Sequence, residues 1–214
     1  MSDIFREIDE ELRKENLAKL WARYGRWVIV AAVLLVVATA VGVGWRQYRE
    51  RESAAQGTRF AAALDLVRDG KDKDAIEAFA AIGRDAGGGH AMLAKLEEAA
   101  LRARTGDVAG ALTIYDRLAN DGSLDPIYRA AATLLAARTA LDRGDAAGAI
   151  RRLQPLTDGQ NPWHPFAIEL TAFAQLKAGD RAAARKSFQR LADDPNAPAG
   201  ARQRATQMIA TLGP

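Results

Sequence analysis

Four glycines recur along the chain at nearly constant spacing, and this periodicity limits the fold more than any other feature. Gly70, Gly106, Gly144 and Gly179 are separated by 36, 38 and 35 residues. A period of this length is typical of helical hairpins that stack in a row, because one hairpin cannot bury its apolar face alone. The spacing therefore predicts a helical repeat array.

Other residue types recur at fixed distances from these glycines. Alanine stands five residues after and seven residues before each one, at Ala75, Ala111, Ala149 and Ala184, and at Ala63, Ala99, Ala137 and Ala172. Large apolar residues stand nine and twelve residues after it, at Phe79, Tyr115, Leu153 and Phe188, and at Ile82, Leu118, Leu156 and Leu191. Facing alanines allow two helices to cross closely, while the large residues fill the groove to the next pair.

The corners of the hairpins also have a local explanation. Glycine ends a helix in the left-handed conformation without a Cβ penalty. Asp107, Asp145 and Asp180 follow three of the glycines, where a carboxylate can cap the next helix. We therefore expect an all-α solenoid of about four helix pairs and a capping helix near 198–212. The first helices of the pairs are expected near 52–69, 90–105, 125–142 and 163–178, and the second helices near 72–84, 108–119, 146–156 and 181–192.

A separate feature precedes the repeats. Residues 27–45 are 19 uncharged, mostly apolar residues bounded by Arg26 and Arg46, with Trp27 and Trp45 at the two ends. As a helix they measure about 28 Å, close to the hydrocarbon thickness of a bilayer. They predict a transmembrane helix between a short charged segment, residues 1–26, and the repeat domain, residues 46–214.

Two alternatives concern this segment. A buried soluble helix would seldom be apolar on every face over this length. A cleaved signal peptide is also an alternative, since Ala38 and Ala40 resemble a cleavage site, but the 26 residues before the apolar run hold six acids and the run continues beyond Ala40.

The charges on the two sides of the apolar run indicate its orientation. The N-terminal flank holds six Lys or Arg and the next twenty residues after the run hold four, which favours a cytoplasmic N-terminus. Residues 3–21 predict an amphipathic helix, either on the membrane surface or as an extension of the anchor.

Composition narrows the function. The chain has no cysteine and two histidines, His90 and His164, so thiol chemistry is excluded and little remains for acid–base or metal chemistry. No P-loop or nucleophile–base pattern is present, and we expect no enzyme, catalytic residue, metal or other cofactor. The net charge of +3 is too small to indicate nucleic-acid binding.

The glycine, alanine and aromatic columns resemble tetratricopeptide repeats, although Lys95, Thr133 and Ile168 stand where that family has an aromatic residue in the first helix. The whole layout, with Gly44-Trp45-Arg46 ending the anchor and Gly179-Asp180-Arg181 near the C-terminus, is similar to the ancillary SecYEG translocon subunit family. This resemblance implies a single-pass inner-membrane protein whose periplasmic repeats bind translocon subunits, periplasmic chaperones and exported clients. A scaffold for another envelope or cell-division complex is the alternative.

Repeat proteins of this type usually bind partners on the surface lined by first helices. Positions ten and six residues before the glycines are predicted to point there: Leu96, Ala100, Leu134, Arg138, Glu169 and Phe173. The alternative is that the leucines and Phe173 belong to the hydrophobic core. A C-terminal basic group could meet anionic lipid or an acidic partner, or form a solvated helix face; it comprises Arg181, Arg185, Lys186, Arg190, Arg202 and Arg204. Oligomeric state is open.

Overall fold

The computed structural model describes the backbone of residues 2–158 and 161–213, and the side chains of residues 21–24, 27, 29–30, 33–158 and 161–213. The described residues form nine helices and no strand: α1 (Ser2–Arg68), α2 (Asp72–Asp85), α3 (Gly88–Thr105), α4 (Val108–Ala119), α5 (Pro126–Asp142), α6 (Ala146–Thr157), α7 (His164–Lys177), α8 (Arg181–Ala192) and α9 (Ala199–Leu212). They divide into two compact units, with the boundary between Ala55 and Gln56. The all-α prediction is confirmed.

The N-terminal unit consists of the first part of α1. Among the described residues, no helix is both long and apolar enough to cross a membrane. The structure thus gives no support to a membrane-spanning segment at residues 27–45, three of whose side chains, at 28, 31 and 32, lie outside the described ones. The predicted amphipathic pattern of residues 3–21 also falls outside them, except for Trp21.

One predicted boundary is wrong. A separate first helix was expected to begin near residue 52, but α1 continues without a break to Arg68. The physical reason lies in the sequence after Trp45, where Arg, Gln, Glu and Ala are frequent and no proline interrupts the backbone. Gly57 alone does not end the helix, because a single interior glycine costs only about 1 kcal/mol.

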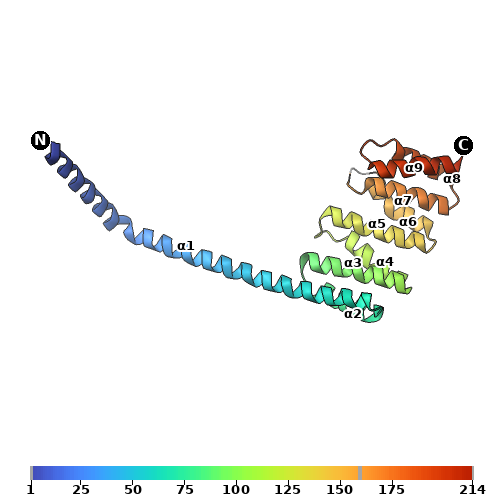
Figure 1. Cartoon of the computed structure of the whole chain (residues 1–214), viewed down its shortest axis with the longest axis horizontal. Helices are drawn as coiled ribbons and strands as arrows, with labels where there is room; N and C mark the ends of the chain where they lie inside the picture. Colours follow the sequence, from blue (N-terminus) through green and yellow to red (C-terminus); the bar gives the residue numbers. More distant parts are fainter. Residues whose placement is uncertain (1, 159–160, 214) are drawn as a thin grey trace. The chain divides into compact units, whose positions relative to one another are not determined.

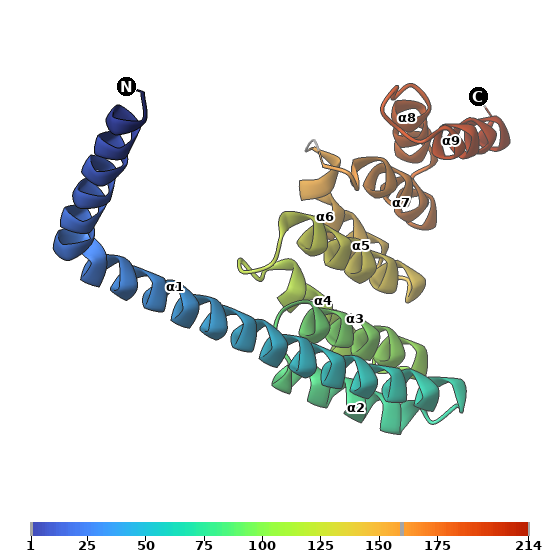
Figure 2. The same cartoon turned by 60° about the vertical axis from the view of Figure 1, so that its left-hand side comes forward.

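In the C-terminal unit, residues 56–213, helical hairpins follow one another in chain order. Figure 1 shows this succession from the end of α1 and α2 at one end to α8 and α9 at the other, and Figure 2 shows the same order from a second direction. The end of α1 and helices α3, α5 and α7 are the first members of the four pairs, and α2, α4, α6 and α8 are the second members. The expected boundaries of α2 to α9 agree with the observed ones within two residues.

The glycines lie at the corners, as predicted. Gly70, Gly106, Gly144 and Gly179 have φ angles of 73°, 100°, 93° and 85°, in the left-handed region. The predicted aspartate caps are present too: one oxygen of Asp107, Asp145 and Asp180 accepts a hydrogen bond from the backbone N–H three residues later, at 2.8–2.9 Å. The first pair has Lys71 at this position, without a side-chain cap.

The core consists of the alanines and large apolar residues that recur at fixed distances from the corner glycines. All eight alanines are at most 1% exposed, and the large residues at the two following positions are buried as well. At the C-terminal end, Ala201 and Ala205 of α9 pack into one cluster with Phe188 and Leu191 of α8. The last helix therefore covers the apolar side of the final pair, as expected.

Candidate protein-binding face

The first helices leave one row of apolar side chains uncovered. Leu93 on α3, Tyr128 and Leu135 on α5, and Phe166 and Phe173 on α7 are 37–50% exposed. They occupy positions 16, 13, 9 and 6 before the corner glycines, and we call the surface formed by these positions of α3, α5 and α7 the first-helix face. Large apolar residues in the rest of the repeat unit are mostly buried, so this concentration is a feature of the face.

The spacing along each helix explains the row. Steps of three, four and three residues keep side chains on one side of a helix. On α5 these positions hold Tyr128, Ala131, Leu135 and Arg138, and on α7 together with its N-cap residue they hold Trp163, Phe166, Leu170 and Phe173. The alanines seven residues before the glycines point into the core between the two rows of helices. The face on α5 and α7 therefore carries one charge in eight positions.

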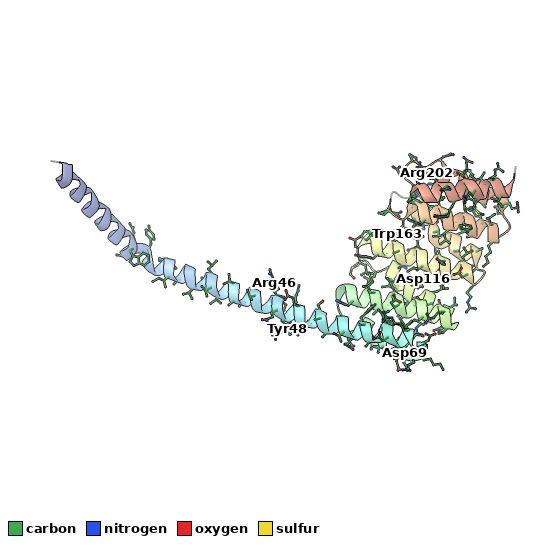
Figure 3. All side chains as sticks on the ribbon, in the orientation of Figure 1. Arg46, Tyr48, Asp69, Asp116, Trp163 and Arg202 are labelled. Atoms are coloured by element: carbon green, nitrogen blue, oxygen red, sulfur yellow. The ribbon has the colours of Figure 1, made fainter. Side chains whose placement is uncertain are left out.

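Trp163 joins the two helices at this face. Its indole Nε1 donates a hydrogen bond to the main-chain oxygen of Ile127, the second residue of α5, at 2.9 Å. Its ring centroid lies 5.9 Å from that of Phe166. Figure 3 shows Trp163 at the end of α7 that adjoins α5. These two contacts hold the Trp163 side chain against the start of α5 and against Phe166, which remains exposed.

The predicted binding residues differ in their surroundings. Leu96 and Leu134 are half-buried and pack against core clusters, in agreement with the core alternative. Glu169 is half-buried and accepts two hydrogen bonds at 2.8 Å from the guanidinium of Arg204 on α9. Position ten before the glycine thus faces a neighbouring helix, so these three side chains are little available to a partner.

The other predicted residues lie on the first-helix face. Arg138 is exposed and has Asp142 as a loose ion-pair partner at 3.8 Å. Phe173 and the buried Phe188 pack in an edge-to-face arrangement with 5.3 Å between centroids, and Phe173 is still 39% exposed. A role of Arg138, Glu169, Phe173, Leu96 or Leu134 in binding stays a prediction.

Four residues of this face were not predicted from the sequence: Leu93, Tyr128, Leu135 and Phe166. The signal that could have found them is the alternating spacing of three and four residues, counted back from each glycine, since position six was already assigned to the surface. Positions 9, 13 and 16 before the glycine belong to the same side of the helix.

The C-terminal basic group is distributed over several contacts. Arg204 binds Glu169, while Arg181 and Arg190 donate hydrogen bonds to the main-chain oxygens of Leu212 and Thr157. Arg202 and Arg204 belong to α9, whereas the other four lie on α8. The group predicted from the sequence is therefore divided between two helices.

The two histidines lie apart from any cluster of metal-ligating side chains in the part of the chain that the structure describes. No group of three His, Asp or Glu side chains there is arranged to hold a metal ion. His164 has its Nδ1 3.1 Å from the main-chain oxygen of Leu156, and His90 lies in the first turn of α3. Both histidines occupy helix starts.

The sequence profile of the tetratricopeptide repeat-like domain family matches residues 18–209, nearly the whole chain. The chain belongs to this family. Members of the tetratricopeptide repeat-like family typically bind proteins through their helical arrays rather than catalyse reactions. No curated protein matches the chain in sequence.

Solved structures agree with the family assignment at the level of the fold. Two crystal structures of the nearly identical tetratricopeptide-like repeats of a putative kinesin light chain from Podosopora anserina, one of them of a variant with a single substitution, are similar to this chain with TM-scores of 0.54 and 0.56. Each is 15% identical, and each match covers 72% of this chain and 83% of the other. At this identity the likeness concerns the fold alone.

Proposed function

We propose that the chain is a protein-binding scaffold that uses its first-helix face, and that residues 27–45 anchor it in a membrane. The observation that carries the binding role is the uncovered row of Tyr128, Leu135, Phe166 and Phe173 on two neighbouring helices. Aromatic and aliphatic side chains that remain exposed in a contiguous patch are typical of protein-interaction sites.

The anchor is supported by the sequence. The 19 uncharged residues from Trp27 to Trp45, bounded by arginines and tryptophans, have the length and the flanking residues of a membrane span. The excess of Lys and Arg before the segment supports a cytoplasmic N-terminus and a periplasmic repeat domain at a bacterial inner membrane.

The resemblance in layout to ancillary SecYEG subunits supports a place beside the Sec translocon, with periplasmic chaperones and exported proteins as partners. Tethering raises the local concentration of a binding surface for chains that emerge nearby, so that modest affinity suffices. A membrane-bound scaffold of this kind helps newly exported proteins by keeping their partners close.

The decisive experiment places a photo-cross-linking amino acid on the first-helix face in cells. The residue replaces Phe166 or Tyr128, with Gln154 on α6, an exposed position of a second helix, as the matched control. We expect protein adducts from Phe166 and Tyr128 at least about tenfold above those from Gln154, in line with an interface hot spot. Translocon subunits are expected among them.

Each part of the proposal has its own contrary result. If adducts form but contain only other envelope or cell-division proteins, the Sec assignment is wrong and the scaffold remains. If neither position exceeds the control, the first-helix face does not bind proteins. Protease treatment of intact spheroplasts tests the anchor, because a periplasmic repeat domain is digested there while residues 1–26 are protected.

A further inference from the structure

The second helices carry an unbalanced charge. Helices α4, α6 and α8 together hold seven basic residues and one acid, Asp116. The basic residues are Arg117, Arg151, Arg152, Arg181, Arg185, Lys186 and Arg190. We call the surface formed by these three helices the second-helix face.

This charge is not a general property of the repeat. Helix α2, the second helix of the first pair, has Lys73 and Arg84 against Asp72, Asp74, Glu77 and Asp85. The imbalance therefore begins at α4 and extends to α8. Six of the seven cations are arginines, whose planar guanidinium matches the oxygen geometry of phosphates and carboxylates.

Most of these charges meet no carboxylate. Arg152 is the member of the set with an ion-pair partner among the described residues, Asp116 at 2.9 Å. Arg181 and Arg190 donate hydrogen bonds to the main-chain oxygens of Leu212 and Thr157 and have no carboxylate within ion-pair distance among the described residues. Arg185 has a buried Nη1 without a hydrogen-bond partner in the described part of the chain.

A groove between two helices of this face and the first helix α5 gathers several arginines. It has a volume of about 420 Å³ and lies between α4, α5 and α6, with Arg129, Arg151 and Arg152 in its wall. The Nε of Arg129 is buried and has no acceptor among the described residues. A buried donor without an acceptor costs free energy, which a bound anion would recover. Asp116 also lines the groove, but Arg152 already holds its carboxylate.

We propose that the second-helix face docks on anionic phospholipid headgroups and that the groove beside Arg129 receives one headgroup phosphate. This inference rests on the proposed membrane anchor, which keeps the repeat domain close to a bilayer. Cations spread over three successive helices match a surface of many anions better than one acidic segment. Each Lys or Arg near such a surface raises the binding constant roughly fivefold, and salt weakens the effect.

The test uses the full chain in vesicles. The chain has no cysteine, so a single introduced cysteine can be labelled with a fluorescent donor. Gln154→Cys places the donor on the second-helix face, and Ala100→Cys on α3 places it on the first-helix face as the control. Energy transfer to a headgroup-labelled lipid is measured in phosphatidylcholine vesicles with and without phosphatidylglycerol. We expect transfer from Gln154 to rise about threefold with phosphatidylglycerol and to fall back at about 0.5 M salt, and transfer from Ala100 to change less.

A pair of matched charge reversals tests the face itself. Arg151→Glu with Lys186→Glu removes two exposed cations of α6 and α8, while Lys71→Glu with Lys73→Glu changes the net charge equally at α2. The first variant is expected to lose the rise in transfer and the second to keep it. Equal behaviour of the two variants, or equal transfer in both lipid mixtures, would overturn the proposal.

Two further outcomes separate the possible failures. If lipid has no effect but the Arg151→Glu, Lys186→Glu variant loses a protein cross-link in native membranes, an acidic protein occupies the face and the lipid proposal is wrong. Flotation of the chain with vesicles tests the anchor independently. Flotation with phosphatidylglycerol vesicles alone supports the second-helix face without an anchor, and flotation with neither vesicle type contradicts both proposals.

Discussion

The guanidinium of Arg152 on α6 donates two hydrogen bonds, at 3.0 and 2.9 Å, to the two carboxylate oxygens of Asp116 on α4. The two residues are 36 positions apart, which is one repeat, and Figure 3 places Asp116 within the stack. The same separation recurs in other contacts: Trp163 with Ile127, Lys177 with Leu141, and, at 37 positions, Arg143 with Gly106. Polar contacts therefore tie the second helix pair to the third and the third to the fourth, in addition to the alanine-rich core.

The Asp116–Arg152 pair predicts a measurable coupling between neighbouring repeats. We expect Arg152→Ala to lower the free energy of unfolding by about 1 kcal/mol, because the pair is bidentate but partly exposed. A double-mutant cycle with Asp116→Ala, measured by urea denaturation, should give a coupling energy of about 0.5–1 kcal/mol. Strictly additive effects of the two substitutions would show that the pair contributes nothing.

The corner glycines predict a conformational cost. Gly144→Ala places a Cβ on a residue with φ of 93°, and we expect a loss of about 1–2 kcal/mol in the free energy of unfolding. Gly57→Ala is the matched control, because Gly57 lies inside helix α1 with open space around it. That change should be neutral or stabilise by up to about 1 kcal/mol. Thermal unfolding followed by circular dichroism distinguishes the two.

The buried alanines predict intolerance of larger side chains. Ala137 on α5 is fully buried in one cluster with Ala149 on α6, so Ala137→Leu forces the two helices apart. We expect a loss of about 1–3 kcal/mol in the free energy of unfolding. Ala61→Leu adds the same atoms at an exposed position of α1 and should change the free energy by less than about 0.5 kcal/mol. A similar loss in both variants would argue against close packing at Ala137.

Asp107 predicts a defined pH dependence. Its hydrogen bond with Arg102, and then its bond from the N–H of Gly110, hold the pKa of the Asp107 carboxyl below its ordinary value. A lowered pKa in the folded state means that the stabilisation is fully present above the unfolded value of about 3.9 and is lost as pH falls through the folded value. The difference in the free energy of unfolding between wild type and Asp107→Asn should therefore be constant near neutral pH and become smaller below about pH 4. An unchanged difference down to acid unfolding would contradict this role.

Much of the repeat unit was predictable because its signals are local and periodic. A left-handed position that needs glycine and a crossing that needs alanine leave the same residue type at one place in every copy, and the aspartate cap recurs in three of the four copies. Gly106, Asp107 and Ala111 together determine a corner and the start of the next helix. The fourfold agreement of such positions placed the helices from α2 onward within two residues.

The remaining features depend on contacts that a single helix does not encode. The extent of α1 was missed because the repeat pattern led us to expect a separate first helix near residues 52–69, whereas no proline stands between Trp45 and Arg68 to end the preceding helix. Glu169 looked like a surface residue, but its partner Arg204 belongs to the capping helix, 35 residues later. The exposed row was assigned to too few positions, since the spacing of three and four residues that places Tyr128 and Phe166 beside Phe173 and Arg138 was not followed further back along each first helix.

The most direct test of the binding role is the affinity of the purified chain for a partner identified by cross-linking at Phe166. The variant Leu135→Ser with Phe166→Ser removes exposed apolar area from α5 and α7, and Gln154→Ser is the control on α6. We predict a dissociation constant raised at least about tenfold for the first variant, with unchanged helicity, and an unchanged constant for the control. Wild-type affinity in the Leu135→Ser, Phe166→Ser variant would contradict the assignment of binding to the first-helix face.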